Sequence, residues 1–182
     1  YALNASRNHV VCHGMPSADE VLQDGDIVNF DITLEKHGYI ADASKMYLIG
    51  QVGPKAQRLV DTTFEAMWAA IKVVRPGARL GDIGHAIQSH AEARGYSVVR
   101  EYCGHGIGRQ MHEEPQILHF GRPGTGLELR EGMVFTIEPM LNQGSARVRG
   151  LKDGWTVVTR DHGLSAQWEH TVAVTRDGFE VL

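Results

Sequence analysis

The 182-residue sequence predicts a single domain of mixed α/β class with antiparallel strands. Segments 28–34 and 133–138 alternate between apolar and polar residues, which is the period of a half-buried strand. Segments 54–74 and 80–94 instead space their apolar residues as amphipathic helices do. No linker or low-complexity tract divides the chain, whose length is that of about one domain. We therefore expect residues 1–182 to form one domain.

The first strand segment places Asp31 on the face opposite its apolar row. Asp42 follows on the other side of a short stretch, residues 37–39, whose His-Gly-Tyr sequence is typical of a turn. A hairpin around this turn would bring the two carboxylates close together.

Both helical segments have ends that the sequence marks. The first begins at Pro54 and is followed by Arg-Pro-Gly at 75–77, which ends a helix. The second runs from about Leu80 to Arg94, and Gly95 has the place of a C-cap. The apolar faces consist of Leu59, Val60, Phe64, Met67, Ile71 and Val74 in the first helix and Ile83, Ile87 and Ala91 in the second.

Further strands are expected around Val98, Val134, Val157 and Val172, with a second hairpin turn at Gly163. Segments 24–31 and 131–138 align without gaps, because each begins with an acidic residue and glycine, continues with β-prone residues, and ends on a carboxylate. This repeat predicts two similar half-domains that meet where Asp31 and Glu138 lie. A chance match of two short strands is the alternative.

The composition is that of an ordinary globular protein, with 42% hydrophobic and 22% charged residues. A formal net charge of -4 gives no electrostatic reason to expect nucleic acid or an anionic membrane as a partner. No apolar stretch approaches the roughly 20 residues of a membrane span. The two cysteines, Cys12 and Cys103, form no disulfide framework, which favours a reducing compartment. Because the chain opens at Tyr1 within what reads as the middle of a domain, we expect the domain to be incomplete at its N-terminus.

Four carboxylates and one imidazole form the candidate metal site: Asp31, Asp42, His105, Glu138 and Glu169. This donor set suits a pair of hard-to-borderline divalent cations. Such a pair lowers the pKa of a bound water, so hydrolysis is the reaction to expect.

Taken singly, each of these residues is more often a solvated strand or turn residue than a ligand. The glycines around His105 raise the alternative of a phosphate-binding loop, but no lysine follows them at the spacing of a Walker motif. The neighbouring pairs Cys12-His13 and Cys103-His105 raise the alternative of a thiol nucleophile. Adjacency in sequence does not orient a histidine as a base, so this alternative is weaker than the metal site.

Eight motifs together match one protein family, in its order and near its spacing. They are VCHGMP at 11–16, DGDIVN at 24–29, DASKM at 42–46, YCGHGIG at 102–108, HEEP at 112–115, TIEPM at 136–140, KDGWT at 152–156 and SAQWEHT at 165–171. On these residues the chain resembles the type I, bacterial-type methionine aminopeptidases over essentially its whole length. The resemblance implies the pita-bread fold, in which two pseudo-symmetric halves surround a dinuclear metal site.

The resemblance also implies the role of each ligand. Asp42, His105, Glu138 and Glu169 would hold one divalent ion, and Asp31, Asp42 and Glu169 the other, with Co, Mn, Fe, Zn or Ni as the metal. Glu138 would carry the proton as general base and acid.

The substrate-binding residues implied by the resemblance lie around the two histidines His13 and His112. His112 would bind the scissile carbonyl and His13 the amide on the leaving side. Cys12, Met111 and Trp155 would line the methionine pocket, where polarizable groups suit a thioether. Four positions depart from the family pattern, namely Asn4, His9, Gln110 and Met111; none is a ligand, and we expect them to affect the shape of the pocket.

The resemblance implies that the substrate is the N-terminal methionine of nascent polypeptides with a small second residue. It also implies a monomeric cytoplasmic enzyme near the ribosome. Two alternatives remain. One is an X-Pro aminopeptidase or prolidase, which uses the same five ligands; the other is a non-catalytic binding module on the same fold. The motifs at 11–16 and 152–156 favour the methionine-specific branch, and the complete ligand set disfavours a binding module.

Overall fold

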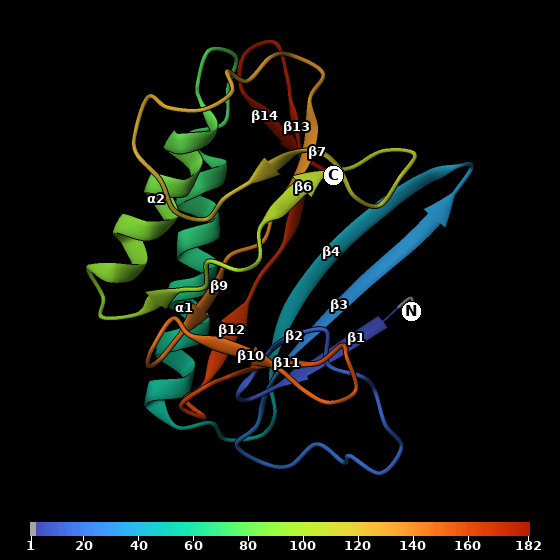
Figure 1. Cartoon of the computed structure of the whole chain (residues 1–182), viewed down its shortest axis with the longest axis vertical. Coiled ribbons are helices and arrows are strands. Elements are labelled where there is room, and N and C mark those ends of the chain that lie inside the picture. Colours follow the sequence, from blue (N-terminus) through green and yellow to red (C-terminus); the bar gives the residue numbers. More distant parts are fainter. Residues whose placement is uncertain (1–2) are drawn as a thin grey trace.

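The computed structural model describes residues 3–182, whose strands form three three-stranded sheets and one five-stranded sheet (Figure 1). The helices are α1 (Pro54–Ile71) and α2 (Leu80–Glu92). The strands are β1 (Leu3–Arg7), β2 (Val10–Cys12), β3 (Ile27–Lys36), β4 (Tyr39–Leu48), β5 (Ser97–Val98), β6 (Gly104–Gly106), β7 (Glu113–Ile117), β8 (Val134–Ile137), β9 (Met140–Asn142), β10 (Val148–Gly150), β11 (Val157–Thr159), β12 (Ser165–Gln167), β13 (His170–Val174) and β14 (Phe179–Val181). The strand orders are β1-β3-β4, β10-β11-β2, β12-β9-β5 and β14-β13-β8-β6-β7.

The predicted hairpin around Gly38 is confirmed. β3 and β4 pair antiparallel along their whole length, from Ile27 opposite Leu48 to Lys36 opposite Tyr39. Asp31 lies opposite Ser44, and Asp42 opposite Thr33, so the two aspartates are diagonal neighbours on one face of the hairpin.

The repeat of 24–31 in 131–138 is visible in the backbone. Gly25 and Gly132 have nearly equal positive φ angles, 91° and 89°, which residues other than glycine rarely adopt. Gly25 N donates to Ile49 O at 2.8 Å after β4, and Gly132 N donates to Val174 O at 2.9 Å at the end of β13. The same turn thus opens β3 in the first half and β8 in the second.

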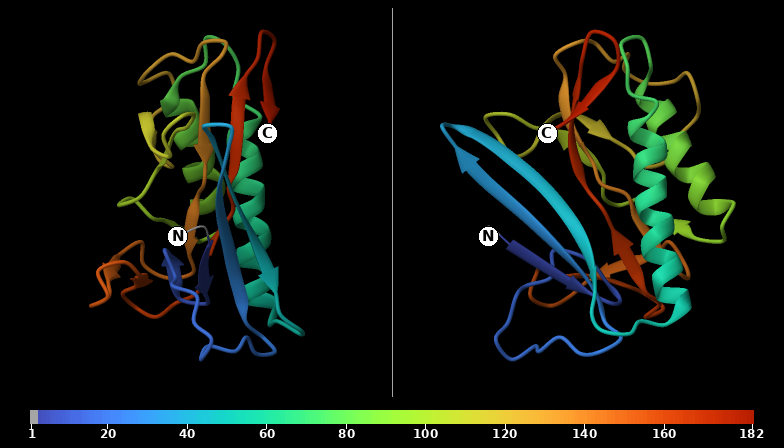
Figure 2. Two further views of the ribbon diagram at one scale, coloured as in Figure 1. Left: turned by 90° about the vertical axis from the view of Figure 1, so that its right-hand side faces the viewer. Right: turned by 180° about the vertical axis from the view of Figure 1, so that it is seen from behind.

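Both predicted helices are present and end slightly earlier than expected. Gly53 and Pro54 start α1, where proline costs no hydrogen bond because the first N–H groups of a helix lack partners. The carboxylate of Asp82 accepts from Arg79 N at 2.8 Å and caps the start of α2. The two helices lie side by side and cover the sheets of the second half, and their buried faces form the main core with β8, β12 and β13 (Figure 2).

Gly84 lets α2 pack directly on the backbone of the segment that follows β7. A Cβ at this position would lie 2.8 Å from Leu118 O and closer still to Phe120 O, and neither carbonyl can swing away as a side chain would. Alanine has a higher helix propensity than glycine, so it is this contact that disfavours alanine at position 84.

We expect Gly84→Ala to lower the free energy of unfolding by about 1–3 kcal/mol, the usual cost of overpacking. Thermal and urea unfolding would measure it. Gly150→Ala is the matched control, since a Cβ there meets no atom within 4 Å. Equal stability of the two variants would contradict the prediction.

The second predicted hairpin, at Gly163, is wrong. β11 before this glycine pairs with β10 and β2, whereas β12 after it pairs with β9, so the segment passes between two sheets. The loop is fixed by its own side chains, because Asp161 accepts from Gly163 N at 3.1 Å and Thr159 Oγ1 donates to Gly163 O at 2.8 Å. Asp161 also accepts from Ser145 N at 2.7 Å, which ties the loop to the segment between β9 and β10.

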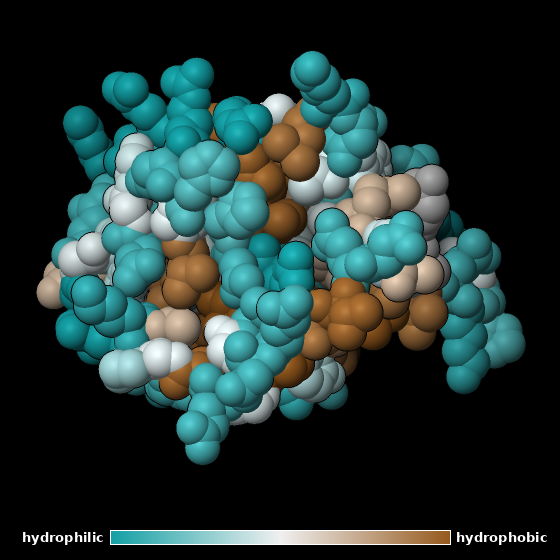
Figure 3. All heavy atoms as spheres, turned by 90° about the horizontal axis from the view of Figure 1, so that it is seen from below, coloured by the Kyte–Doolittle hydropathy of each residue, from teal (hydrophilic) through white to brown (hydrophobic). Residues whose placement is uncertain are grey.

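The apolar row of β3 begins at Val28, which is buried, but its outer part is exposed in the described residues rather than half buried. Ile32 is 45% and Leu34 60% exposed, and with β4, Trp168 and Leu182 they line an open cavity of about 720 Å³. In a space-filling view, apolar residues gather at the middle of one face and toward the side on which the β3–β4 hairpin projects (Figure 3). Within residues 3–182, neither helix is long and apolar enough to cross a membrane.

Candidate metal centre

The ligand-type residues of both halves converge on one buried point. One ligand atom each from Asp42 on β4, His105 on β6 and Glu169 before β13 lies within 4.8 Å of the others. Glu138, directly after β8, places Oε1 3.5 Å from His105 Nε2, which is also 3.8 Å from Asp42 Oδ2. Four of the five predicted ligands are therefore adjacent.

Asp31, the fifth, lies beside Asp42 on the same face of the hairpin. Asn4 Nδ2 donates to its Oδ2 at 3.2 Å, while the buried Oδ1 has no hydrogen-bond partner among the described residues. A buried carboxylate oxygen without a donor is costly unless a cation is present. This free oxygen and the oxygen-rich donor set fit divalent ions.

The two halves are joined at this point by backbone and side-chain bonds. Glu169 N donates to Ser44 O at 3.2 Å, and Ser44 N donates to Glu169 O at 3.4 Å. Asn29 Nδ2 donates to Ser44 Oγ at 3.1 Å and to Gln167 O at 2.8 Å. The site is therefore assembled from long-range contacts between strands.

Three polar side chains that the sequence analysis missed fix the carboxylates. Thr136 Oγ1 donates to Glu138 Oε1 at 2.8 Å and accepts from His105 N at 3.0 Å. Gln167 Nε2 donates to Glu138 Oε2 at 3.3 Å, and Thr33 Oγ1 donates to Asp42 Oδ1 at 2.9 Å. Thr136 and Gln167 each precede a ligand by two residues, so the period of a strand could have identified both.

His105 presents a defined ring nitrogen to the carboxylates. Its Nδ1 lies 3.0 Å from Gly106 O, which requires the proton on Nδ1 and leaves Nε2 free as a ligand. Burial lowers the pKa of His105, which favours the neutral form that binds metal.

The carboxylates repel one another in the metal-free protein. Burial above all, together with the neighbouring Asp42 and Asp31, raises the pKa of Glu138 to about 8 against the opposing hydrogen bond from Thr136. Burial, followed by the charges of Glu138, Asp42 and Asp31, raises the pKa of Glu169 well above its ordinary range. The pKa values of Asp31 and Asp42 are also raised, mainly by burial. Such a cluster keeps protons unless cations replace them.

The two predicted substrate histidines lie near this point. The ring of His112 lies 4.4 Å from that of His105, and the ring of His13 stacks on Trp155 at 5.1 Å. Burial lowers the pKa of His13, so its imidazole is neutral at pH 7. Met111 precedes His112 in the loop between β6 and β7.

Cys12 lies in a small apolar cluster with Val11, Val99, Met140 and Val157, and it is 4% exposed. Burial raises the pKa of the Cys12 thiol far above its usual range, and burial also raises the pKa of Cys103. Neither thiol is activated as a nucleophile, which disfavours that alternative.

Residues 2–176 match the profile of metallopeptidase family M24. The chain belongs to this family. As a member, it is expected to bind divalent metal ions, for which the cluster described above supplies the donors.

Within the family, the chain is similar to methionine aminopeptidases. It is 56% identical over 181 residues to methionine aminopeptidase B of Synechocystis sp. and 58% identical over 177 residues to the methionine aminopeptidase of Rickettsia prowazekii. These matches cover 100% and 97% of the chain but 66% and 68% of the two relatives. The chain thus spans about two thirds of their length.

The solved structures agree. The crystal structure of the Rickettsia prowazekii methionine aminopeptidase superposes with a TM-score of 0.96, covering 98% of this chain and 72% of that one. The prolidase of Pyrococcus horikoshii OT3 superposes with a TM-score of 0.76 at 22% identity, which shows the shared fold alone. The predicted pita-bread fold, with two similar halves around a central site, is confirmed.

Proposed function

We propose that this chain is the catalytic part of a metal-dependent aminopeptidase that removes N-terminal methionine. The observation that carries the proposal is the buried convergence of Asp42, His105, Glu138 and Glu169 in a chain 58% identical to a methionine aminopeptidase. Preference for a small second residue is part of the proposal and rests on the resemblance.

Asp42, His105, Glu138 and Glu169 would hold one divalent ion, and Asp31, Asp42 and Glu169 the second. When bound, the ions lower the pKa of water and polarise the scissile carbonyl. Co, Mn, Fe, Zn and Ni all suit the donor set.

The chain's own residues divide the remaining work. Glu138, held at both oxygens by Thr136 and Gln167, takes a proton from the attacking water and returns it to the leaving amine. His112, beside His105, donates to the carbonyl oxygen as negative charge develops. His13, stacked on Trp155, binds the amide on the leaving side, and Cys12, Met111 and Trp155 form the methionine pocket.

We propose, on the resemblance alone, that the enzyme is a monomer. As part of the same proposal, the substrates are newly made polypeptides in the cytoplasm, close to the ribosome.

We expect metal-stripped protein to release methionine from a Met-Ala-Ser peptide when Mn or Co is added, with saturation near about two equivalents for a two-ion site. Met-Leu-Ser should react more slowly, and Ala-Pro-Ser should not react. Cleavage of Ala-Pro-Ser instead would show the X-Pro alternative. Tight metal binding without cleavage of any peptide would favour a binding module.

A further inference from the structure

His119 is a buried histidine that the proposed mechanism does not use. The residue is 0% exposed, and it lies after β7 in a segment that packs against α2. Its Nε2 lies 3.4 Å from the backbone nitrogen of Glu138, which donates its N–H to the ring. Its buried Nδ1 has no hydrogen-bond partner among the described residues.

The N–H of Glu138 lies where the chain leaves one sheet for another. β8 ends at Ile137, which lies opposite His170 on β13, and β9 begins at Met140 and pairs with β12. Pro139 follows Glu138 and has no N–H of its own. An acceptor from outside both strand pairs is therefore needed, and His119 supplies it.

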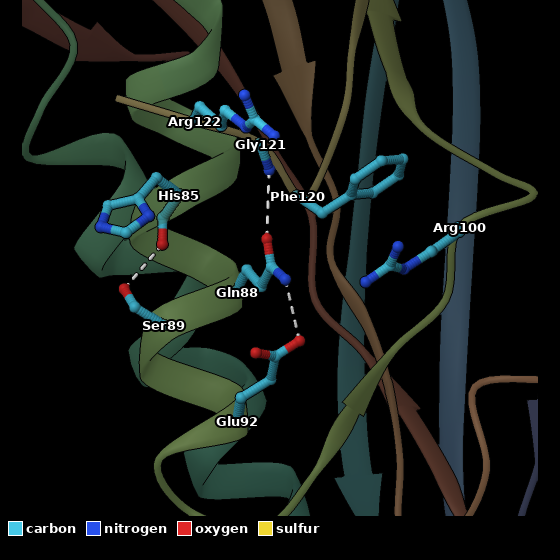
Figure 4. Close-up of a pocket in the computed structure, with 8 residues that line it drawn as sticks. All are labelled: His85, Gln88, Ser89, Glu92, Arg100, Phe120, Gly121 and Arg122. Carbon is cyan, nitrogen blue, oxygen red and sulfur yellow. Dashed lines mark hydrogen bonds between the residues drawn. The ribbon is translucent and has the colours of Figure 1, made fainter. Parts of the chain in front are cut away.

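The backbone that carries His119 is held from outside by α2. Gly121 N donates to Gln88 Oε1 at 3.2 Å, and Gln88 Nε2 donates to Glu92 Oε1 at 2.9 Å (Figure 4). Arg100 lies over the Phe120 ring at 4.9 Å. Together with the close approach at Gly84, these contacts hold the backbone on both sides of His119, whose Nε2 accepts from Glu138 N.

A buried imidazole with one nitrogen unpartnered lowers the stability of the fold relative to an apolar side chain at the same position. Leucine has a similar size and would avoid burying a polar group without a partner. The hydrogen bond to Glu138 is the feature that leucine could not replace.

We propose that His119 is a positioning residue of the metal centre, whose Nε2 fixes the backbone of Glu138 and thereby the direction of its carboxylate. The inference deepens the proposed function, on which the role of Glu138 rests. His119 acts through Glu138 and does not touch the substrate.

Three variants of the whole chain test this, namely His119→Gln, His119→Asn and His119→Leu. Glutamine carries an oxygen at the reach of Nε2, asparagine carries one only at the reach of Nδ1, and leucine carries none. We expect leucine and asparagine to weaken Mn binding and to lower kcat by about tenfold to a hundredfold, the effect of one lost buried hydrogen bond. KM for Met-Ala-Ser should change little, and glutamine should restore both quantities to within about threefold.

Calorimetry gives the Mn affinity without any catalysis. Equal Mn affinity and kcat in all three variants would overturn the proposal, even if their melting temperatures fell together.

NMR of the unmodified metal-free protein with ¹⁵N-labelled histidine decides the matter if a variant does not fold. The proton is expected on Nδ1 of His119; a proton on Nε2 would overturn the proposal, because that nitrogen could not then accept from Glu138. If the chain proved to have no peptidase activity, the expected Mn affinities of the three variants and the expected Nδ1 proton of His119 would stay the same.

Discussion

Replacing Glu169 with glutamine is expected to lower Mn affinity and methionine release by more than about a hundredfold, since loss of groups outside the ligand shell already costs about 10- to 100-fold. Glu169 is 2% exposed and lies within 4.8 Å of ligand atoms of Asp42 and His105. In the proposed scheme it contacts both ions. Glutamine keeps the size of the side chain but removes the negative charge, so the loss reflects the donor and not the packing.

The matched control is Glu180→Gln, which removes an exposed carboxylate on β14. It should leave both Mn affinity and peptide cleavage unchanged. Calorimetry and a Met-Ala-Ser assay measure the two quantities separately. Wild-type Mn affinity in Glu169→Gln would exclude Glu169 as a ligand.

The period of the strands explains how much of the site the sequence could predict. Asp31 and Asp42 were expected to lie close together because β3 alternates between apolar and polar residues and a turn follows it. Glu138 was placed by the repeat, and the equal φ angles of Gly25 and Gly132 show that both segments use one turn. Local patterns of this kind depend only on neighbouring residues.

Features that depend on distant residues were not predicted. The hydrogen bond from Glu138 to His119 joins two segments of different strand pairs, and no periodic pattern marks His119. The loop at Gly163 has turn composition, but Asp161 and Thr159 direct it into another sheet. The apolar row of β3 was expected to be half buried, but Ile32 and Leu34 are exposed. The alternation predicts an apolar face, whereas the burial of that face depends on residues distant in the sequence.

The metal-free protein is expected to lose stability as the pH rises from about 6.5 to 8, by about 1–3 kcal/mol. Burial raises the pKa of Glu138 from 4.5 in the unfolded chain to about 8 in the folded one, and the pKa of Glu169 is raised as well. Between these pKa values the folded state binds more protons than the unfolded state. The free energy of unfolding therefore falls as the pH rises, and the contribution of Glu138 is fully lost above about 8.

The histidines act in the opposite direction but in a lower range. Burial lowers the pKa of His105 and His13 below 6.5, so their contribution to stability is lost as the pH falls below 6.5. Well above pH 6.5 these imidazoles are neutral in both states and add nothing further. The upper part of the interval from 6.5 to 8 therefore reports mainly on the carboxylates.

Thermal unfolding in the presence of a chelator, at intervals between pH 6.5 and 8, measures this slope. Glu169→Gln should flatten it and should make the metal-free protein more stable than wild type at pH 8, because one buried charge is gone. Added Mn should reverse the order, since the ion stabilises only the protein with the complete ligand set. A wild-type slope in Glu169→Gln would mean that the charges of this cluster do not govern the stability of the metal-free fold. The expected reversal would show that the same carboxylates oppose folding without metal and support it with metal.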